Sequence, residues 1–122
     1  MVKLVCLLKR KQGLTFEEFK DYYETSHAPL AIGYLAKAVD YQRRYLDPAM
    51  PGYLEGGEEM PGVYDCITEV WFESRADMED NLAVLADSES AKVVIEDEER
   101  FLDRDQMRFF VVEDECRLPT GS

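Results

Sequence analysis

Apolar residues change their spacing several times along the chain, and each change predicts a different element. Residues 2–9 (Val-Lys-Leu-Val-Cys-Leu-Leu-Lys) form an apolar run that is closed by a Gln-Gly turn signal. Residues 39–46 carry two tyrosines, and residues 64–72 are rich in aromatic and β-branched side chains, which favour strands. Residues 107–112 are a last run rich in Phe and Val. We therefore expect four strands.

Helical spacing appears after the first strand. Thr15 and Glu18 have the spacing of a capping box, so a helix should begin there. Apolar and aromatic residues then recur at steps of three and four, which places them on one face. That face carries Phe16, Phe19, Tyr23 and His27. We expect the helix to end near Ala28, because the residue before a proline is disfavoured in the α region.

The stretch between the third and fourth strands predicts two further helices. Ser74 is suited to cap a helix over residues 75–86, and a shorter helix should cover residues 91–101. The order strand, helix, strand, strand, helix, strand is the split βαβ of an α+β, ferredoxin-like domain. We expect one domain over residues 1–122, with an antiparallel sheet and its helices on one face. If the other face of the sheet is apolar, it must be buried, and the sheet of a second copy of the chain is the simplest partner for it.

Residues 47–63 differ from the rest of the chain. They hold three of the five prolines and four of the seven glycines. Proline cannot donate a ladder hydrogen bond and glycine adds backbone freedom, so this segment is not expected to join the sheet. We expect a mobile lid or an arm that embraces the dimer, because long connections of this kind tend to be functional or disordered.

Composition narrows the possible partners. The formal net charge is −12. Such a chain repels phosphate backbones and anionic lipid, which argues against nucleic-acid and membrane partners. No apolar run approaches the ~20 residues of a membrane span, and no secretory signal is recognised, so we expect a cytoplasmic protein. One histidine and three cysteines without a CxxC spacing predict no metal site and no disulfide framework.

Strand alternation suggests one carboxylate with a possible chemical role. Along residues 64–72, one set of side chains faces away from the helix-facing set. That outward set is Asp65, Ile67, Glu69 and Trp71. Glu69 in an apolar cavity would have a raised pKa and would suit a general acid or base. The alternative is that Glu69 only pairs with an arginine: Arg43, Arg44 or Arg108.

Several stretches resemble the EthD family. They are Leu4 to Lys11, Gly13-Leu14-Thr15, Glu17-Glu18-Phe19, Tyr22-Tyr23, His27-Ala28-Pro29-Leu30, Tyr64-Asp65, Glu69 to Phe72, Phe101-Leu102-Asp103 and Arg108 to Val112. The resemblance covers nearly the whole chain outside residues 47–63. It implies a dimeric α+β barrel in which two sheets face each other and enclose a cavity. It also implies reactions that mostly need neither a metal nor an organic cofactor.

His27 is the sharper catalytic candidate. Imidazole is the side chain whose unperturbed pKa lies near neutrality, so it can carry protons. The resemblance implies that the His-Ala-Pro motif lines the cleft. The alternative is a structural histidine that caps a carbonyl before Pro29. Tyr23 and Tyr41 are expected to form the pocket wall, together with Trp71, and the resemblance places Asp65 beside the pocket mouth, where a backbone-capping role is an equal alternative.

The expected function is proton transfer on a small oxygenated molecule without a cofactor. A lactone, a phenol or a polyketide fragment would be isomerised, dehydrated, cyclised or decarboxylated, with His27 and Glu69 or a tyrosine as partners. The alternative is a non-catalytic accessory protein of an oxygenase or degradation pathway that binds an apolar ligand. An enzyme should place His27 against a second polar group in a closed cavity, whereas a binding protein should engage it only through backbone.

Overall fold

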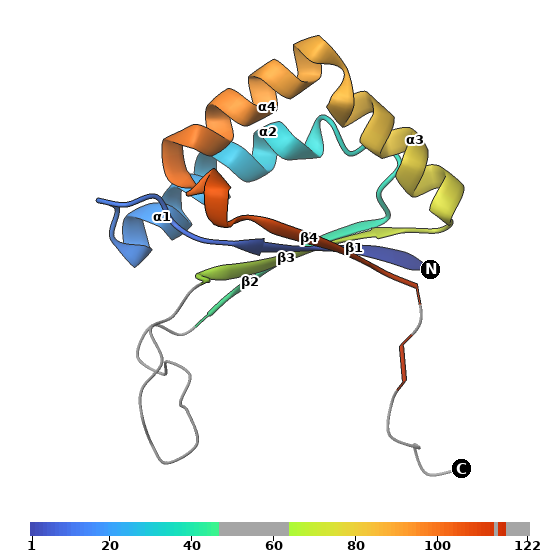
Figure 1. Ribbon diagram of the computed structural model, residues 1–122, viewed down its shortest axis with the longest axis horizontal. Coiled ribbons are helices and arrows are strands. Elements are labelled where there is room, and N and C mark those ends of the chain that lie inside the picture. The colour runs from blue at the N-terminus through green and yellow to red at the C-terminus, as the bar shows by residue number, and fades with distance from the viewer. Residues whose placement is uncertain (47–63, 114, 117–122) are drawn as a thin grey trace.

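The protein is described by a computed structural model that covers residues 1–46, 64–113, 115 and 116. Its four strands form one antiparallel sheet with the order β2-β3-β1-β4 (Figure 1). The strands are β1 (Val2–Leu8), β2 (Asp40–Tyr45), β3 (Cys66–Phe72) and β4 (Arg108–Val112). This is the predicted ferredoxin-like arrangement. The lid or arm predicted for residues 47–63 lies outside the described residues.

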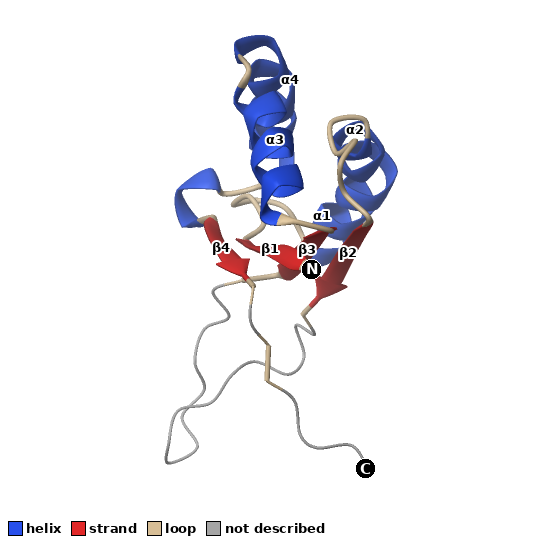
Figure 2. Ribbon diagram, turned by 90° about the vertical axis from the view of Figure 1, so that its right-hand side faces the viewer, coloured by secondary structure: helices blue, strands red, loops and turns tan. Residues whose placement is uncertain are grey.

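All the helices pack on one side of this sheet, as Figure 2 shows. In chain order they are α1 (Phe16–Tyr22), η1 (Tyr23–His27), α2 (Ala28–Ile32), α3 (Arg75–Ala86), α4 (Ser88–Phe101) and the short 3-10 turn η2 (Arg104–Gln106). The other face of the sheet carries no helix of the described chain, so the predicted one-sided layering is confirmed. Within the described residues, no helix combines the length and the apolar character that crossing a membrane would require.

The predicted helix starts are confirmed by their caps. The Glu18 backbone N–H donates to Thr15 Oγ1 at 3.1 Å, and the Thr15 N–H donates to Glu18 Oε1 at 3.0 Å. The two bonds satisfy donors that the first turn of a helix leaves unpaired. Ser74 caps α3 in the same way, accepting from the Asp77 N–H at 3.1 Å.

The predicted end of the first helix near Ala28 is wrong. The helix widens into the π turn η1, where the Ala28 N–H donates to the Tyr23 carbonyl, and it then continues as α2 to Ile32. Pro29 has no N–H to donate and its ring would crowd a regular α turn, so the wider turn accommodates it in the first turn of α2. The helix predicted over residues 91–101 is also longer than expected. It begins at Ser88, directly after Asp87 breaks the end of α3.

Strand register decides which side chains the helices cover. Leu4 pairs with Val70 and Cys6 with Thr68 across β1 and β3. Because both strands alternate in step, these four side chains share the helix-facing side. The helices add aromatic residues that are almost completely buried: Phe19, Tyr23 and Phe101. The packing of these rings under the helices fixes the surroundings of the site.

Candidate functional site

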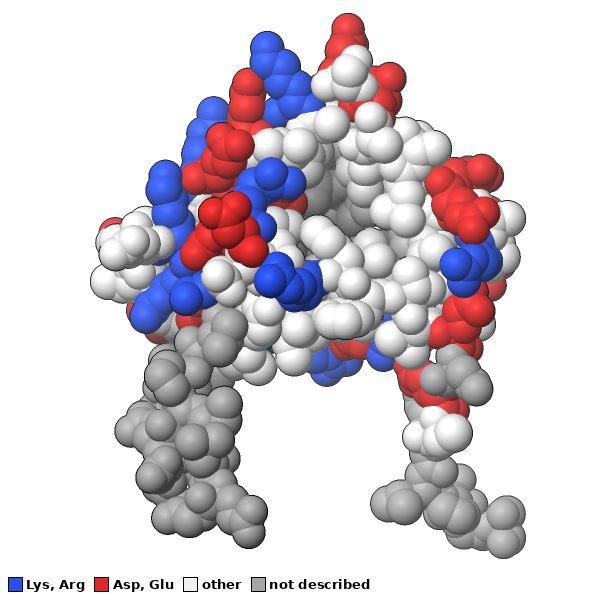
Figure 3. All heavy atoms as spheres, viewed as in Figure 1, with Lys and Arg blue, Asp and Glu red and all other residues white. Residues whose placement is uncertain are grey.

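A cavity of about 110 Å³ lies between the helices and the sheet. Most of its wall is apolar, and five side chains bring hydrogen-bonding groups to it: Tyr23, His27, Tyr41, Thr68 and Glu98. Figure 3 shows that the face seen in Figure 1 is hollowed below the helices, with many uncharged side chains around the hollow. The family resemblance implied a cavity between two facing sheets. The cavity that one copy forms by itself lies instead on the helix side.

His27 is held by a carboxylate from a distant helix. Its Nδ1 lies 2.7 Å from Oδ2 of Asp97 on α4, and His27 is only 5% exposed. Burial by itself would raise the pKa of Asp97, but hydrogen bonds from Tyr22, His27 and Arg100 outweigh it and lower that pKa. An ionised carboxylate can only accept, so Nδ1 of His27 carries the proton that it donates.

This contact determines what the other ring nitrogen can do. When the imidazole is neutral and Nδ1 is protonated, Nε2 has a free lone pair. His27 lines the cavity, and Nε2 has no hydrogen-bond partner among the described residues. The arrangement is that of a histidine base whose tautomer is set by a buried carboxylate, which is the orienting half of a hydrolase triad. His27 therefore combines a fixed orientation with an available acceptor.

Asp97 is in turn held by two further donors. The Tyr22 hydroxyl donates to Oδ1 at 2.6 Å, and Arg100 Nη1 donates to the same atom at 2.9 Å. The Phe101 ring packs 4.7 Å from the His27 ring, between centroids, and limits how far the imidazole can turn. Asp97 was not predicted from the sequence. The available signal was its spacing of four from Phe101, which puts a carboxylate beside the apolar face of α4.

Two tyrosines form a hydrogen-bonded chain at the cavity floor. The hydroxyl of Tyr23 lies 2.8 Å from that of Tyr41 and 2.6 Å from Thr68 Oγ1. Burial raises the pKa of both phenols, so both stay protonated at neutral pH and act as hydrogen-bond donors, not as bases. The structure thus brings together three residues that the sequence singled out: His27, Tyr23 and Tyr41.

Glu98, next to Asp97 on α4, is the carboxylate that lines the cavity itself. Its side chain is 15% exposed, and Arg104 Nε donates to its Oε1 at 3.2 Å. Burial raises the pKa of Glu98 even though Arg104 opposes the shift. Glu98 can therefore hold a proton more readily than an ordinary glutamate. It was missed in the sequence, although its spacing of four from Val94 places it on the apolar face of α4.

The raised pKa that we expected for Glu69 is wrong. Glu69 lies on the sheet face away from the helices and binds Lys3 Nζ at 2.6 Å, as well as Arg44. Hydrogen bonds from Lys3 and then from Arg44 lower its pKa. The arginine pairing weighed as the alternative is present, and Lys3 from the neighbouring strand adds to it. His27 and Glu69 therefore lie on opposite faces of the sheet.

Two other predicted binding residues also lie away from the cavity. Trp71 shares the face of Glu69, with Lys3 Nζ 4.6 Å from its ring centre. Asp65 accepts the Arg10 backbone N–H at 2.8 Å, which is the capping role considered for it. Burial raises the pKa of Cys66 to about 12, so its thiol is a poor nucleophile. Among the described residues, no three His, Cys, Asp or Glu side chains are grouped as metal ligands would be.

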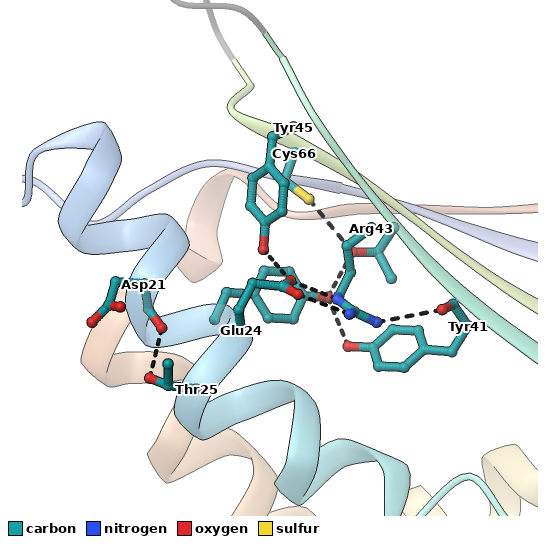
Figure 4. Close-up of polar contacts among 9 residues, drawn as sticks. Asp21, Glu24, Thr25, Tyr41, Arg43, Tyr45 and Cys66 are labelled. Atoms are coloured by element: carbon teal, nitrogen blue, oxygen red, sulfur yellow. Dashed lines mark hydrogen bonds and ion pairs between the residues drawn. The ribbon is translucent and has the colours of Figure 1, made fainter.

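An ion pair fastens η1 to the sheet beside these tyrosines, as Figure 4 shows. Glu24 of η1 accepts from Arg43 Nε at 2.6 Å and Nη2 at 2.9 Å, and from the Tyr45 hydroxyl at 2.5 Å. The Arg43 hydrogen bond is the main reason that the pKa of Glu24 is lowered. Because Glu24 directly follows Tyr23, this pair fixes the turn that carries both Tyr23 and His27.

Comparison with known proteins identifies the family. The model of the EthD domain matches residues 11–105. The chain belongs to the EthD domain family. No curated protein matches it.

Solved structures agree with this assignment of the fold. An EthD family protein of Bacillus halodurans C-125 is 18% identical with a TM-score of 0.63, covering 94% of this chain and 99% of its own. An EthD-like protein of Ralstonia eutropha JMP134 is 13% identical with a TM-score of 0.62, covering 92% and 89%. A dimeric ferredoxin-like protein of Thermobifida fusca YX is 11% identical with a TM-score of 0.58, covering 91% and 88%.

The opposite pKa shifts of Glu24 and Glu98 predict opposite effects of pH on stability. A carboxylate whose pKa is lowered in the folded state, such as Glu24, stabilises the fold above pH ~4, and this contribution is lost as the pH falls through that region. A carboxylate whose pKa is raised in the folded state, such as Glu98, makes the fold less stable as the pH rises through the same region. Glu24→Gln should therefore be less stable than the parent at neutral pH and approach it in acid. Glu98→Gln should have the same free energy of unfolding as the parent in acid and become more stable than the parent as the pH rises. Urea unfolding from pH 3 to 7 measures both, and slopes of the same sign would contradict the assignment.

Proposed function

We propose that this EthD domain protein is a cofactor-independent enzyme that moves a proton on a small, oxygenated, partly aromatic metabolite. The observation that carries the proposal is the His27–Asp97 hydrogen bond of 2.7 Å beside an apolar cavity. A buried carboxylate that accepts from one ring nitrogen sets the tautomer of a histidine. A general base needs its tautomer set, because its accepting nitrogen must face the substrate.

His27 Nε2 is the proposed base. It would remove a proton from a carbon or hydroxyl group of a substrate that lies in the cavity, and Asp97 would stabilise the imidazolium that forms. The apolar wall supports this role, because an electrostatic interaction is stronger where water is excluded. Asp97 is a positioning residue in this scheme, since it acts through His27.

Glu98 is the proposed acid, in place of Glu69. Its raised pKa favours the protonated form, which can return a proton to the substrate or to a leaving hydroxyl group. The Tyr23 and Tyr41 hydroxyls would hold a substrate oxygen and stabilise negative charge that develops on it. A base and an acid in one apolar cavity support isomerisation, dehydration, cyclisation or decarboxylation, all of which need only proton transfers from the protein.

We also propose that the protein is a homodimer in which the helix-free faces of two sheets meet. That face carries side chains from three strands: Val5, Leu7, Ile67, Trp71, Phe110 and Val112. Phe110 is 52% exposed in one copy. An apolar surface of this kind indicates an interface, and the Thermobifida fusca protein of the same fold is dimeric.

The catalytic proposal predicts that His27→Ala lowers turnover by ~10²–10⁴-fold, the usual contribution of a positioned base. The physical reason is the loss of the only accepting nitrogen that Asp97 orients. Initial rates on a panel of lactones, phenols and β-keto aromatic compounds provide the measurement. Circular dichroism and sedimentation of the same samples show whether the variant remains folded.

His27→Gln separates catalysis from structure, because glutamine keeps a hydrogen-bonding side chain but cannot titrate near neutral pH. Its turnover should stay as low as that of His27→Ala even where its stability recovers. Full activity in the glutamine variant would contradict the proposed base, and the protein would then be treated as a carrier of an apolar ligand.

The dimer proposal predicts that Phe110→Lys dissociates the protein, because a charge would have to be buried between the two sheets. Val84→Lys is the matched control, since Val84 is 50% exposed but lies on α3. Sedimentation equilibrium at micromolar concentration should give twice 14.1 kDa for the parent and the control, and 14.1 kDa for Phe110→Lys. A parent protein that sediments at 14.1 kDa would overturn the dimer.

A further inference from the structure

A second, larger hollow adjoins the cavity that holds His27. It has a volume of about 470 Å³ and lies among α3, α4 and β4; we call it the outer groove. The two spaces have five lining residues in common: Leu4, Leu85, Val94, Glu98 and Phe109. Because they share these side chains, the two spaces lie directly beside each other.

The two spaces differ in their chemistry. Four hydrogen-bonding side chains line the inner cavity alone: Tyr23, His27, Tyr41 and Thr68. The residues that only the outer groove adds are apolar except Arg104: Leu82, Ala91, Ile95, Phe110 and Val111. Phe110 belongs to the edge strand and, because it pairs with Val5, its side chain also belongs to the helix-free face. Arg104 is already paired with Glu98. A ligand that matches both spaces therefore has an oxygenated end for the inner cavity and an apolar remainder for the outer groove.

The volumes limit the size of each part. An apolar cavity of ~150 Å³ in another protein holds one benzene molecule. The inner cavity, at about 110 Å³, is smaller than that, so a six-membered ring with its oxygen atoms would extend past Phe109 into the outer groove. The outer groove is about four times larger and would hold a chain of several carbons beyond the ring.

We infer that the substrate is an oxygenated ring that carries an apolar chain, and that it binds with its oxygen atoms inward and its chain in the outer groove. This inference rests on the proposed function, because it takes the His27 side of the cavity as the reacting end. The shared wall of Leu85, Val94 and Phe109 contacts the ring at the junction. Chain length is then selected by the outer groove and the chemistry by the inner cavity.

A series of 4-alkylphenols, from phenol to 4-hexylphenol, tests this orientation with the chain of 122 residues. Titration calorimetry should show affinity rising by about fourfold per methylene, the fold-change that corresponds to ~0.8 kcal/mol for a buried CH₂ group. If the chain instead entered the inner cavity, affinity would stop rising after about two carbons, because so small a volume would be full. That plateau would overturn the inference.

Ala91→Trp provides the matched test of the outer groove, because Ala91 lines that groove and not the inner cavity. The variant should bind phenol as the parent does but lose the increase with chain length. Ala83→Trp, at an exposed position of α3, is the control and should behave as the parent. Ile95→Ala is a milder second variant, and its longest-chain ligands should bind several-fold more weakly. An unchanged chain-length series in both groove variants would contradict the inference.

The outcomes separate this inference from the proposed function. His27→Gln should weaken the binding of every phenol by the same factor. The gain in affinity per methylene should stay unchanged, since the alkyl chain of the ligand does not touch His27. A normal chain-length series with full turnover in His27→Gln would remove the catalytic proposal and keep the groove as a ligand site. If Ala91→Trp alters the sedimentation coefficient but not the chain-length series, the groove is covered by a second copy and the inference fails.

Discussion

The hydrogen bond between His27 and Asp97 joins η1 to α4 across 70 positions of sequence and is the contact on which the site depends. Removing the Asp97 carboxylate would leave the buried Nδ1–H of His27 without an acceptor, which costs more than a hydrogen bond ordinarily contributes. Tyr22 and Arg100 complete the pairing of Asp97, so the carboxylate is ionised although it is only 5% exposed. The whole cluster is therefore a single electrostatic unit.

The backbone is shaped to support this unit. The wide turn η1 carries Tyr23 at its first position and His27 at its last, and the Glu24–Arg43 pair fastens the turn to β2. π turns of this kind occur frequently at functional sites. Phe101, at the end of α4, packs on both Tyr23 and His27, with ring centres 5.3 Å and 4.7 Å away. The π turn η1 thus places Tyr23 and His27 where Phe101 packs on both of them and buries them.

Local patterns predicted the fold well, because the capping box at Thr15 and the alternation in β3 depend on neighbouring residues. Tyr23 and His27 were identified from their helical spacing, which also depends on residues close in sequence. Asp97 and Glu98 were missed, since only the packing of α4 over η1 brings Asp97 to His27 and Glu98 to the cavity. The direction of the Glu69 pKa was wrong because alternation identifies a face but not its neighbours. Lys3 reaches Glu69 from the adjacent strand, a register that the sequence does not reveal.

Asp97 fixes the tautomer of His27, and the proposed role of Nε2 as the base depends on that tautomer. The chain has one histidine, so ¹⁵N nuclear magnetic resonance of the labelled imidazole reports on His27 alone. When the ring is neutral, we expect a protonated Nδ1 and an unprotonated Nε2 in the parent protein, and a changed tautomer population in Asp97→Asn. A neutral ring protonated at Nε2 in the parent protein would contradict this assignment, because the ring nitrogen that Asp97 does not engage could not then act as the base.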